Sequence, residues 1–317
     1  MGLFDKMKEP IFLKETGSSN EQLEGLKALL PDAPQEIQVQ IERDIKLLSA
    51  GMYGEEQIAF ELKNSHMPMF ILHDLFLTDG DLSAQIDYLV ITRKRNFVIE
   101  CKNLFGNIEI NNNGDFIRTV YYNGRYNKEG IYSPITQNQR HLELIKKILR
   151  ESKSNFIIKA LFERFERFFY DTYRTVVVLA NPKTVLNAKY AKKEIKEQVI
   201  RADQLVDHIK QINSQRGCDT SSEKDTEELA RYFLSLHRGN PADYIEKYRT
   251  QIAEYREKSE PTAAETKTPE KEPVAETMIC PYCGASMVKR IAKRGRNKGN
   301  RFWGCSSYPK CRAIVEI

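Results

Sequence analysis

The chain has 317 residues, of which 41% are hydrophobic and 29% charged, with a net charge of +5, as expected for a globular protein with one sizeable domain and a smaller module. No apolar run approaches the roughly 18 residues that a membrane helix requires, and the first residues lack the apolar core of a secretory signal. We therefore expect a cytoplasmic protein without a membrane partner.

Helices are predicted before the first strand, which is expected over residues 69–77. Apolar residues at helical spacing indicate a helix over residues 35–49. Gly51 and Gly54 interrupt this pattern, so we expect a separate helix over 55–63 with Glu55 in its first turn. The helix dipole favours a carboxylate at that position, which offers a purely structural explanation for Glu55.

Two apolar runs, 85–91 and 97–102, read as the strands of one hairpin joined by a polar turn. Residues two apart in a strand share a face, so Glu100 and Lys102 are expected to point the same way. Asp87 lies on the neighbouring strand, close enough to place its carboxylate beside Glu100. The hairpin therefore combines two carboxylates and one amine in an otherwise apolar setting.

These three groups suit phosphodiester hydrolysis. Asp87 and Glu100 could hold Mg²⁺ or Mn²⁺ through oxygen, and the ion would polarise a phosphate and lower the pKa of a bound water. Lys102 would orient or deprotonate that water, or stabilise the developing negative charge. The alternative is a cross-strand ion pair at a sheet edge, although burying charges without a purpose is costly.

The region resembles the PD-(D/E)xK nuclease core, and more narrowly the nuclease-related domain (NERD) family, over roughly residues 45–150. The matching motifs are Gly51-Met52-Tyr53-Gly54-Glu55-Glu56-Gln57-Ile58, Gln85-Ile86-Asp87 and Ile99-Glu100-Cys101-Lys102-Asn103 with Gly106-Asn107-Ile108. The resemblance implies an α/β fold with a restriction-endonuclease-like mixed sheet flanked by helices, and it implies a catalytic set of Glu55, Asp87, Glu100 and Lys102. Ile86 departs from the strict nuclease pattern, which has a proline there, but the NERD variant tolerates this.

Beyond the hairpin, two short strands are predicted at 107–110 and 116–121, followed by a loop over 122–133. Ser133-Pro134 then opens a helix. Gln137 lies near its start, in a Pro-x-x-Gln pattern that also looks like the NERD family, and an amide there suits contact with a phosphate. A solvated polar helix face explains Gln137 equally well.

Aromatic and basic residues interleave over residues 151–172, which suits stacking on bases, although a helix packed on the core explains the same residues. Residues 174–180 form an apolar, β-branched run typical of a buried strand. Helices predicted at 202–212 and 227–236 complete an α/β layer structure. From about residue 254 the composition becomes acidic and proline-containing, which indicates a disordered linker.

We accordingly divide the chain into four parts. They are an N-terminal helical extension (1–44), a NERD nuclease-like domain with C-terminal helices (45–250), a disordered acidic linker (251–277) and a C-terminal zinc-ribbon-like module (278–317). The last part contains nine Lys or Arg and one Glu, which leaves a charge of about −3 for the rest of the chain. A basic tail of this kind favours an acidic partner.

Four of the six cysteines lie in this module, at Cys280, Cys283, Cys305 and Cys311. In a chain expected to be cytosolic, such clustering favours metal binding over disulfides. Four thiolates close a tetrahedral Zn²⁺ shell without an open position, so we predict a structural zinc ion that replaces a large core. Four reduced cysteines without metal are the alternative.

The module resembles the C-terminal zinc fingers of type IA DNA topoisomerases. The matching segments are Cys280-Pro281-Tyr282-Cys283-Gly284 and Phe302-Trp303-Gly304-Cys305-Ser306-Ser307-Tyr308-Pro309-Lys310-Cys311. In those enzymes such fingers bind DNA, chiefly single strands, through cations on phosphates and aromatic faces on bases. The predicted contacts are Lys289, Arg290, Lys293, Arg294, Arg296, Lys298, Arg301, Phe302, Trp303 and Tyr308. Trp303 could also form the small core of the finger.

Together these patterns predict a DNA-binding, metal-dependent nuclease-like protein with structural Zn²⁺, catalytic Mg²⁺ or Mn²⁺, and DNA, particularly single-stranded DNA, as its partner. RNA is a less favoured target. The alternative function is a non-catalytic DNA-binding scaffold that keeps the nuclease fold and the topoisomerase-type finger without topoisomerase activity. No G-x-x-x-x-G-K loop is present, so we expect no ATP-driven motor.

Overall fold

The computed structural model describes residues 8–122, 124–152, 156–217, 219–239, 243–259, 278, 280–281, 285–291, 301–309 and 311–316. The chain divides into two compact units, Met1–Glu260 and Pro261–Ile317, and each is described by itself. Within the described ranges, no helix combines the length and the apolar character needed to span a membrane.

The first unit contains both sheets of the α/β region. Its strands are β1 (Pro10–Lys14), β2 (Met69–Asp79), β3 (Leu82–Ile91), β4 (Asn96–Lys102), β5 (Asn107–Ile110), β6 (Phe116–Tyr122), β7 (Arg125–Ile131), β8 (Tyr173–Leu179), β9 (Leu186–Asn187) and β10 (Val199–Arg201). Its α-helices are α1 (Ser19–Leu29), α2 (Gln35–Lys63), α3 (Pro134–Arg150), α4 (Phe156–Phe165), α5 (Phe169–Thr172), α6 (Lys193–Lys196), α7 (Leu205–Ser214), α8 (Glu223–Leu236) and α9 (Tyr244–Ser259). Short 3-10 helices are η1 (Leu30–Asp32), η2 (Glu166–Phe168) and η3 (Ala202–Gln204).

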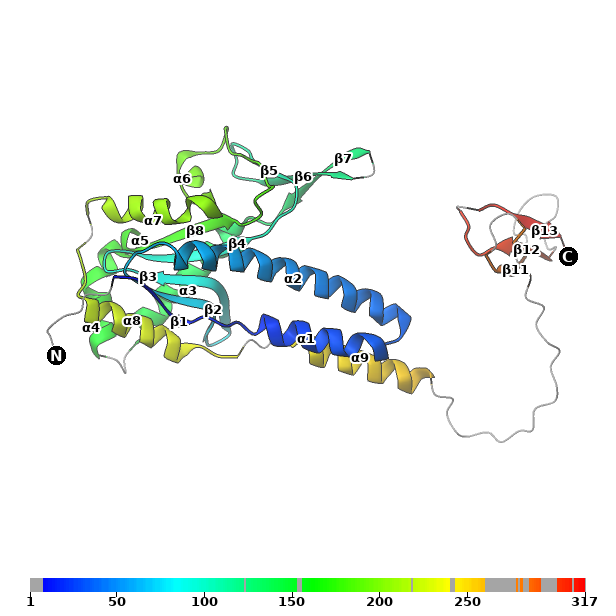
Figure 1. Ribbon diagram of the computed structural model, residues 1–317, viewed down its shortest axis with the longest axis horizontal. Coiled ribbons are helices and arrows are strands. Elements are labelled where there is room, and N and C mark those ends of the chain that lie inside the picture. Colours follow the sequence, from blue (N-terminus) through cyan, green and yellow to red (C-terminus); the bar gives the residue numbers. More distant parts are fainter. Residues whose placement is uncertain are drawn as a thin grey trace. The chain divides into compact units, whose positions relative to one another are not determined.

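The main sheet is mixed, with the strand order β1-β2-β3-β4-β8-β10. Strands β2, β3 and β4 are antiparallel neighbours, whereas β1 pairs with β2, β4 with β8 and β8 with β10 in parallel. Helices α3, α4 and α8 pack on one face, and the C-terminal part of α2 packs with α7 on the other (Figure 1). The predicted α/β class, a mixed sheet flanked by helices, is confirmed.

Strand β4 is buried on both faces. Val98 belongs to the apolar cluster under α3, whereas Ile99 belongs to the cluster under α2 and α7. This double burial explains why β4 reads as a continuous apolar run. It also places Glu100, near the end of the strand, in the interior, with only 2% of its surface exposed.

The alternation of side chains between the two faces of the sheet shifts by one residue near Asp74, in β2 and in β3 alike. Leu72 and Leu75, three residues apart on β2, face the same core cluster, and so do Ile86 and Leu89 on β3. The pairing register is kept across the change, and Asp74 accommodates it with a positive φ of 51°. Aspartate tolerates this left-handed conformation better than most residues.

Helix α2 is unbroken from Gln35 to Lys63, so the prediction of two helices separated by Gly51 and Gly54 was wrong. Glycine within a helix costs only about 1 kcal/mol, which the packing of α2 outweighs. Gly54 also permits a close approach, because a Cβ atom there would lie 2.7 Å from the Cβ of Asn103. Glu55 therefore lies inside the helix, and the helix dipole does not explain it.

Strands β1 and β7 escaped prediction, as did the two-residue strand β9. β1 forms the edge of the main sheet, parallel to β2, in a segment where Pro10 obscured the pattern. β7 occupies much of the predicted loop at 122–133 and pairs with β6 in a second sheet of order β7-β6-β5-β9. Nearly every residue of β7 is exposed, so it has no apolar alternation that a sequence could show.

Helix α9 packs with α1 and the N-terminal part of α2 around Leu26, Ile41 and Tyr248. It continues to Ser259, through residues where the predicted linker should already have begun. The composition was misleading because one apolar stripe, including Tyr248 and Ile252, suffices to hold a mostly charged helix. The rest of the predicted linker, residues 260–277, lies outside the described residues.

The aromatic segment at 151–172 forms α4, η2 and α5. Phe162 and Phe169 are buried in the main core, which favours the packing explanation for these two rings. Phe156, Phe168 and Tyr170 are exposed.

The second unit has a three-stranded antiparallel sheet of order β11 (Met287–Ile291), β12 (Arg301–Cys305) and β13 (Ile314–Glu316). Among the described residues of this unit, Cys280, Met287, Trp303 and Cys305 form a buried cluster. Two of its four members are predicted zinc ligands, as expected if a metal ion supplements the core.

Candidate functional site

A polar pocket of about 230 Å³ lies where α2, the middle of β3, the end of β4 and the start of α3 meet. Its lining residues are Gly51, Glu55, Gln85, Asp87, Glu100, Cys101, Lys102, Asn103 and Gln137. The structure thus gathers the four residues predicted to be catalytic, together with Gln137, around one opening. Their chemical roles remain predictions.

Asp87 is placed by the backbone of β4. The paired register of β3 and β4 ends at Tyr88 and Ile99. Past that pair, Asp87 Oδ2 accepts a hydrogen bond of 2.6 Å from the backbone N–H of Cys101. The carboxylate therefore takes the acceptor position that a strand carbonyl would otherwise fill, which fixes it next to Glu100.

Glu100 and Lys102 share a face of β4, as the alternation of the strand predicts. Lys102 Nζ donates to Glu100 Oε1 over 2.5 Å and to Gln137 Oε1 over 3.1 Å. Glu100 Oε2 is buried without a hydrogen-bond partner among the described residues, and it lies 3.6 Å from His141 Nδ1. One oxygen of this carboxylate is therefore paired and the other is unsatisfied.

The pocket concentrates negative charge in a poorly solvated place. Burial, and then the charges of Glu100 and Glu55, raise the pKa of Asp87 well above its ordinary value. Burial also raises the pKa of Glu100, although the charge of Lys102 opposes the rise. A cation would relieve this repulsion, and carboxylate oxygens, one of them unsatisfied, are the donors that a hard divalent ion prefers.

Glu55 enters the pocket from α2 and is held from the sheet. His73 Nε2 donates to Glu55 Oε2 over 2.8 Å. Burial opposes protonation of His73, but hydrogen bonds to Glu55 and to the carbonyl of Glu15 outweigh it and raise the pKa of His73 above its ordinary value.

Sequence reasoning assigned no role to two histidines beside the site. His141 lies one turn after Gln137 on α3, and this spacing could have drawn attention to it. Burial, and then the charge of Lys102, lower the pKa of His141 to about 4, so the ring is neutral at about pH 7. His73 gave no such signal, because its place depends on how β2 pairs with β3.

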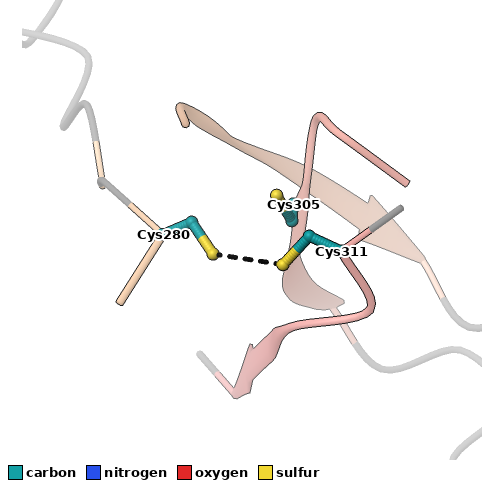
Figure 2. Close-up of side chains that lie close together, drawn as sticks. All are labelled: Cys280, Cys305 and Cys311. Carbon is teal, nitrogen blue, oxygen red and sulfur yellow. Dashed lines mark hydrogen bonds between the residues drawn. The ribbon is translucent and has the colours of Figure 1, made fainter. Parts of the chain in front are cut away.

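Three of the four predicted zinc ligands converge in the second unit. The sulfur atoms of Cys280, Cys305 and Cys311 lie within 4.8 Å of one another, and those of Cys280 and Cys311 are 3.8 Å apart (Figure 2). Cys283 lies outside the described residues. Thiolates that converge from separate segments are the donor set of a structural zinc site, so the cluster fits Zn²⁺.

The predicted nucleic-acid contacts of the finger differ in exposure. Trp303 is 9% exposed and lies in the core, with Lys289 Nζ 4.8 Å from its ring centroid, so the core explanation fits it better than base stacking does. Tyr308 is 60% exposed. Lys289, Arg290 and Arg301 are exposed, and Phe302 is half-buried. The remaining predicted contacts, Lys293, Arg294, Arg296 and Lys298, lie outside the described residues.

Comparison with protein-family models gives two matches. Residues 50–180 match the nuclease-related domain (NERD), and residues 277–317 match the topoisomerase DNA binding C4 zinc finger. The resemblances to the NERD family and to the topoisomerase zinc finger, which were inferred from the motifs, are thereby confirmed. The first match indicates a nuclease-like domain, and the second suggests DNA binding and, with the cysteine cluster, supports structural Zn²⁺. No curated protein and no solved structure matches the chain.

Proposed function

We propose that the protein is a DNA-binding, metal-dependent nuclease-like enzyme that hydrolyses phosphodiester bonds at the pocket between α2, β3, β4 and α3. The observation that carries the proposal is the convergence of three carboxylates, from Glu55, Asp87 and Glu100, beside the amine of Lys102. Two of these carboxylates have raised pKa values because they are buried, which is costly unless a cation joins them.

In this proposal Asp87 and Glu100 hold Mg²⁺ or Mn²⁺, and Glu55 supports the same site. When bound, the ion supplies positive charge that polarises a phosphate and acidifies a water. Lys102 is kept at the pocket by Glu100 and Gln137, where it can orient the attacking water or stabilise negative charge on the phosphate. The backbone N–H of Cys101 holds Asp87 in place throughout.

The finger would hold the nucleic acid. Exposed Lys289, Arg290 and Arg301 can neutralise phosphates, and the exposed ring of Tyr308 offers a face to an unpaired base. We therefore propose single-stranded DNA as the preferred ligand of the finger. Because both units belong to one chain, DNA bound by the finger reaches the pocket at a raised local concentration.

The test compares the wild type with Asp87→Ala and Lys102→Ala on plasmid and on single-stranded DNA, with Mg²⁺ or Mn²⁺ present. Asp81→Ala, in the exposed turn between β2 and β3, serves as the control. Zinc content and circular dichroism confirm that each variant is folded. Cleavage that only the two pocket substitutions abolish supports the proposal.

The scaffold function is the other outcome of that test. DNA binding without cleavage by any variant would leave the carboxylate pocket without a catalytic role and the finger as the working part. The close pairing of Lys102 with Glu100 is the observation that favours this outcome, because it also describes a simple structural ion pair. Competition between single-stranded DNA and RNA of equal length then identifies the ligand.

A further inference from the structure

The side chain of Glu55 must be held in one conformation if its carboxylate is to contribute to the pocket. It lies within α2, and 22% of its side chain is exposed. A glutamate side chain has several rotatable bonds, and fixing one in a single conformation costs up to about 2 kcal/mol of conformational entropy. The hydrogen bond of 2.8 Å from His73 Nε2 to Glu55 Oε2 opposes this freedom.

His73 is itself fixed on two sides. Its Nδ1 donates to the backbone carbonyl of Glu15 over 2.8 Å, and its ring stacks on Tyr88 with centroids 4.6 Å apart and planes 20° apart. Both ring nitrogens face acceptors, so each is placed to donate a hydrogen bond when it carries a proton. The acceptor at Glu55 is a carboxylate, and a hydrogen bond to an ionised carboxylate is stronger than one between neutral groups.

Tyr88 extends this support to the backbone of α2. Its hydroxyl donates to the backbone carbonyl of Glu55 over 2.9 Å. Two stacked rings from neighbouring strands thus hold one residue of α2, one ring at the side chain and the other at the main chain. The position of the helix and the direction of the carboxylate are set by the same pair of strands.

Several hydrogen bonds hold the strand backbone next to His73. Lys14 Nζ donates to the carbonyls of His73 and Asp74, each over 2.8 Å. The carboxylate of Asp74 accepts from Ser18 N over 3.0 Å and from Gln85 Nε2 over 2.8 Å. These contacts hold the positive φ of Asp74 at the point where the alternation shifts in β2 and β3. Less favoured backbone that is held by several contacts often accompanies a functional site.

His73 acts from outside the pocket. It does not line the polar pocket, but lines a neighbouring one of about 250 Å³ together with Glu55 and Tyr88. It can therefore hold Glu55 without taking space from a metal ion, a water or a phosphate.

We propose that His73 is a positioning residue of the metal site: it holds the carboxylate of Glu55 at the edge of the pocket that contains Asp87 and Glu100. The inference rests on the proposed function, because it needs that pocket to bind a divalent ion. It adds a residue that neither the motifs nor the family match assigns. Partners of this kind commonly change metal affinity about 10-fold or more when they are removed.

The test measures Mn²⁺ binding to the full-length, zinc-loaded protein by electron paramagnetic resonance of the free ion. The binding that Asp87→Ala abolishes defines the site. His73→Phe keeps a ring on Tyr88 but removes both donors, whereas His73→Gln can still donate to Glu55. We expect His73→Phe to weaken the Asp87-dependent binding about 10-fold and His73→Gln to restore most of it.

Two controls test whether His73 acts through Glu55. In a Glu55→Ala background, His73→Phe should cause no further loss, since the ring acts through Glu55. His66→Phe, at a histidine whose side chain is 77% exposed and contacts Glu9, should leave Mn²⁺ binding unchanged. The Glu55→Ala background also reveals a general loss of folding caused by His73→Phe.

The outcomes are distinct. Asp87-dependent Mn²⁺ binding that His73→Phe leaves unchanged would overturn the role of His73 and leave the proposed function standing. An equal loss in the Glu55→Ala background would also overturn it, because His73 would then act by another route. Absence of Asp87-dependent binding in the wild type would overturn both this inference and the proposed function.

Discussion

Lys102 Nζ lies 2.5 Å from Glu100 Oε1, whereas Glu100 Oε2 has no hydrogen-bond partner among the described residues. One buried carboxylate is thus satisfied on one side only. Its raised pKa, caused by burial, means that the ionised form is disfavoured in the folded protein relative to water. The fold therefore carries a charged group that it would be more stable without.

Glu100→Gln should make the metal-free protein more stable while abolishing divalent-metal binding. The amide has nearly the same shape but no charge, so we expect the free energy of unfolding to rise by about 1 kcal/mol at about pH 7. Urea unfolding measures this, with Glu109→Gln on β5, a half-buried glutamate near Lys128, as the control. A loss of stability would mean that the ion pair outweighs the cost of burial.

The two glycines of α2 should respond in opposite ways to alanine. At Gly54 a Cβ atom would meet Asn103 Cβ at 2.7 Å and Cys101 Sγ at 3.1 Å, so Gly54→Ala should destabilise the fold by about 1–3 kcal/mol. At Gly51 nothing lies within 4 Å, so Gly51→Ala should stabilise the helix by up to about 1 kcal/mol. Urea unfolding distinguishes them, and equal effects would contradict the close approach of α2 to β4.

Zinc removal should unfold the finger and leave the first unit intact. Trp303 is the sole tryptophan of the chain and is 9% exposed beside Met287 and Cys305, so its fluorescence reports on the finger alone. A strong chelator, or Cys305→Ser, should shift its emission to longer wavelength as the ring enters water. Urea unfolding of the first unit, followed by circular dichroism, should not change. An unshifted emission would show that the core of the finger does not depend on metal.

Tyr308→Ala should weaken binding of single-stranded DNA while zinc content stays the same. The ring is 60% exposed, and one base–aromatic stack is worth about 1–3 kcal/mol, which corresponds to a loss of about 5- to 150-fold in affinity. Fluorescence anisotropy with a labelled oligonucleotide measures the loss. Tyr126→Ala, at a 75% exposed tyrosine of β7, is the matched substitution in the first unit. A larger effect there would place the main contact on the β6–β7 hairpin.

Acid should destabilise the contact between α8 and β2. His237 Nδ1 accepts a hydrogen bond of 3.1 Å from Phe76 N, which requires an unprotonated nitrogen. Burial, and then the charge of Lys14, lower the pKa of His237 below its ordinary value. The folded state therefore binds fewer protons than the unfolded state, so this stabilisation is present above about pH 6.5 and is lost as the pH falls below it.

His237→Asn tests that dependence, since the Asn Oδ1 can accept from Phe76 without titrating. The variant should lose less stability than the wild type between about pH 7.5 and pH 5.5. His66→Asn, at an exposed histidine, should leave the wild-type pH dependence unchanged. Identical pH profiles for all three proteins would exclude His237 as the cause.

The chemistry of the pocket was visible in the sequence because it follows from alternation within a strand. Glu100 and Lys102 are two residues apart, so any strand places them on one face, and Asp87 follows from the hairpin. The three-dimensional arrangement adds what alternation cannot supply. Cys101 N reaches Asp87 only because the pairing of β3 with β4 stops one step earlier.

Other features depend on contacts between residues far apart in the chain, so no local sequence pattern predicts them. The course of α2 through Gly54 is decided by its packing on β4, against the local preference of glycine. His73 joins Glu55 through the pairing of β2 with β3, and no spacing in the sequence links residues 55 and 73. Strand β7 forms because its backbone pairs with β6, although its own side chains are almost all exposed.

The packing of α9 determines where the chain can be truncated without exposing apolar surface of the fold. Tyr248 and Ile252 cover apolar surface on α2 around Ile41. A chain that ended at residue 250 would lose Ile252 and leave that surface in water, which would favour aggregation and proteolysis. The charged residues up to Ser259 thus belong to the fold that carries the pocket, and a C-terminal truncation should preserve that fold only if it begins after them.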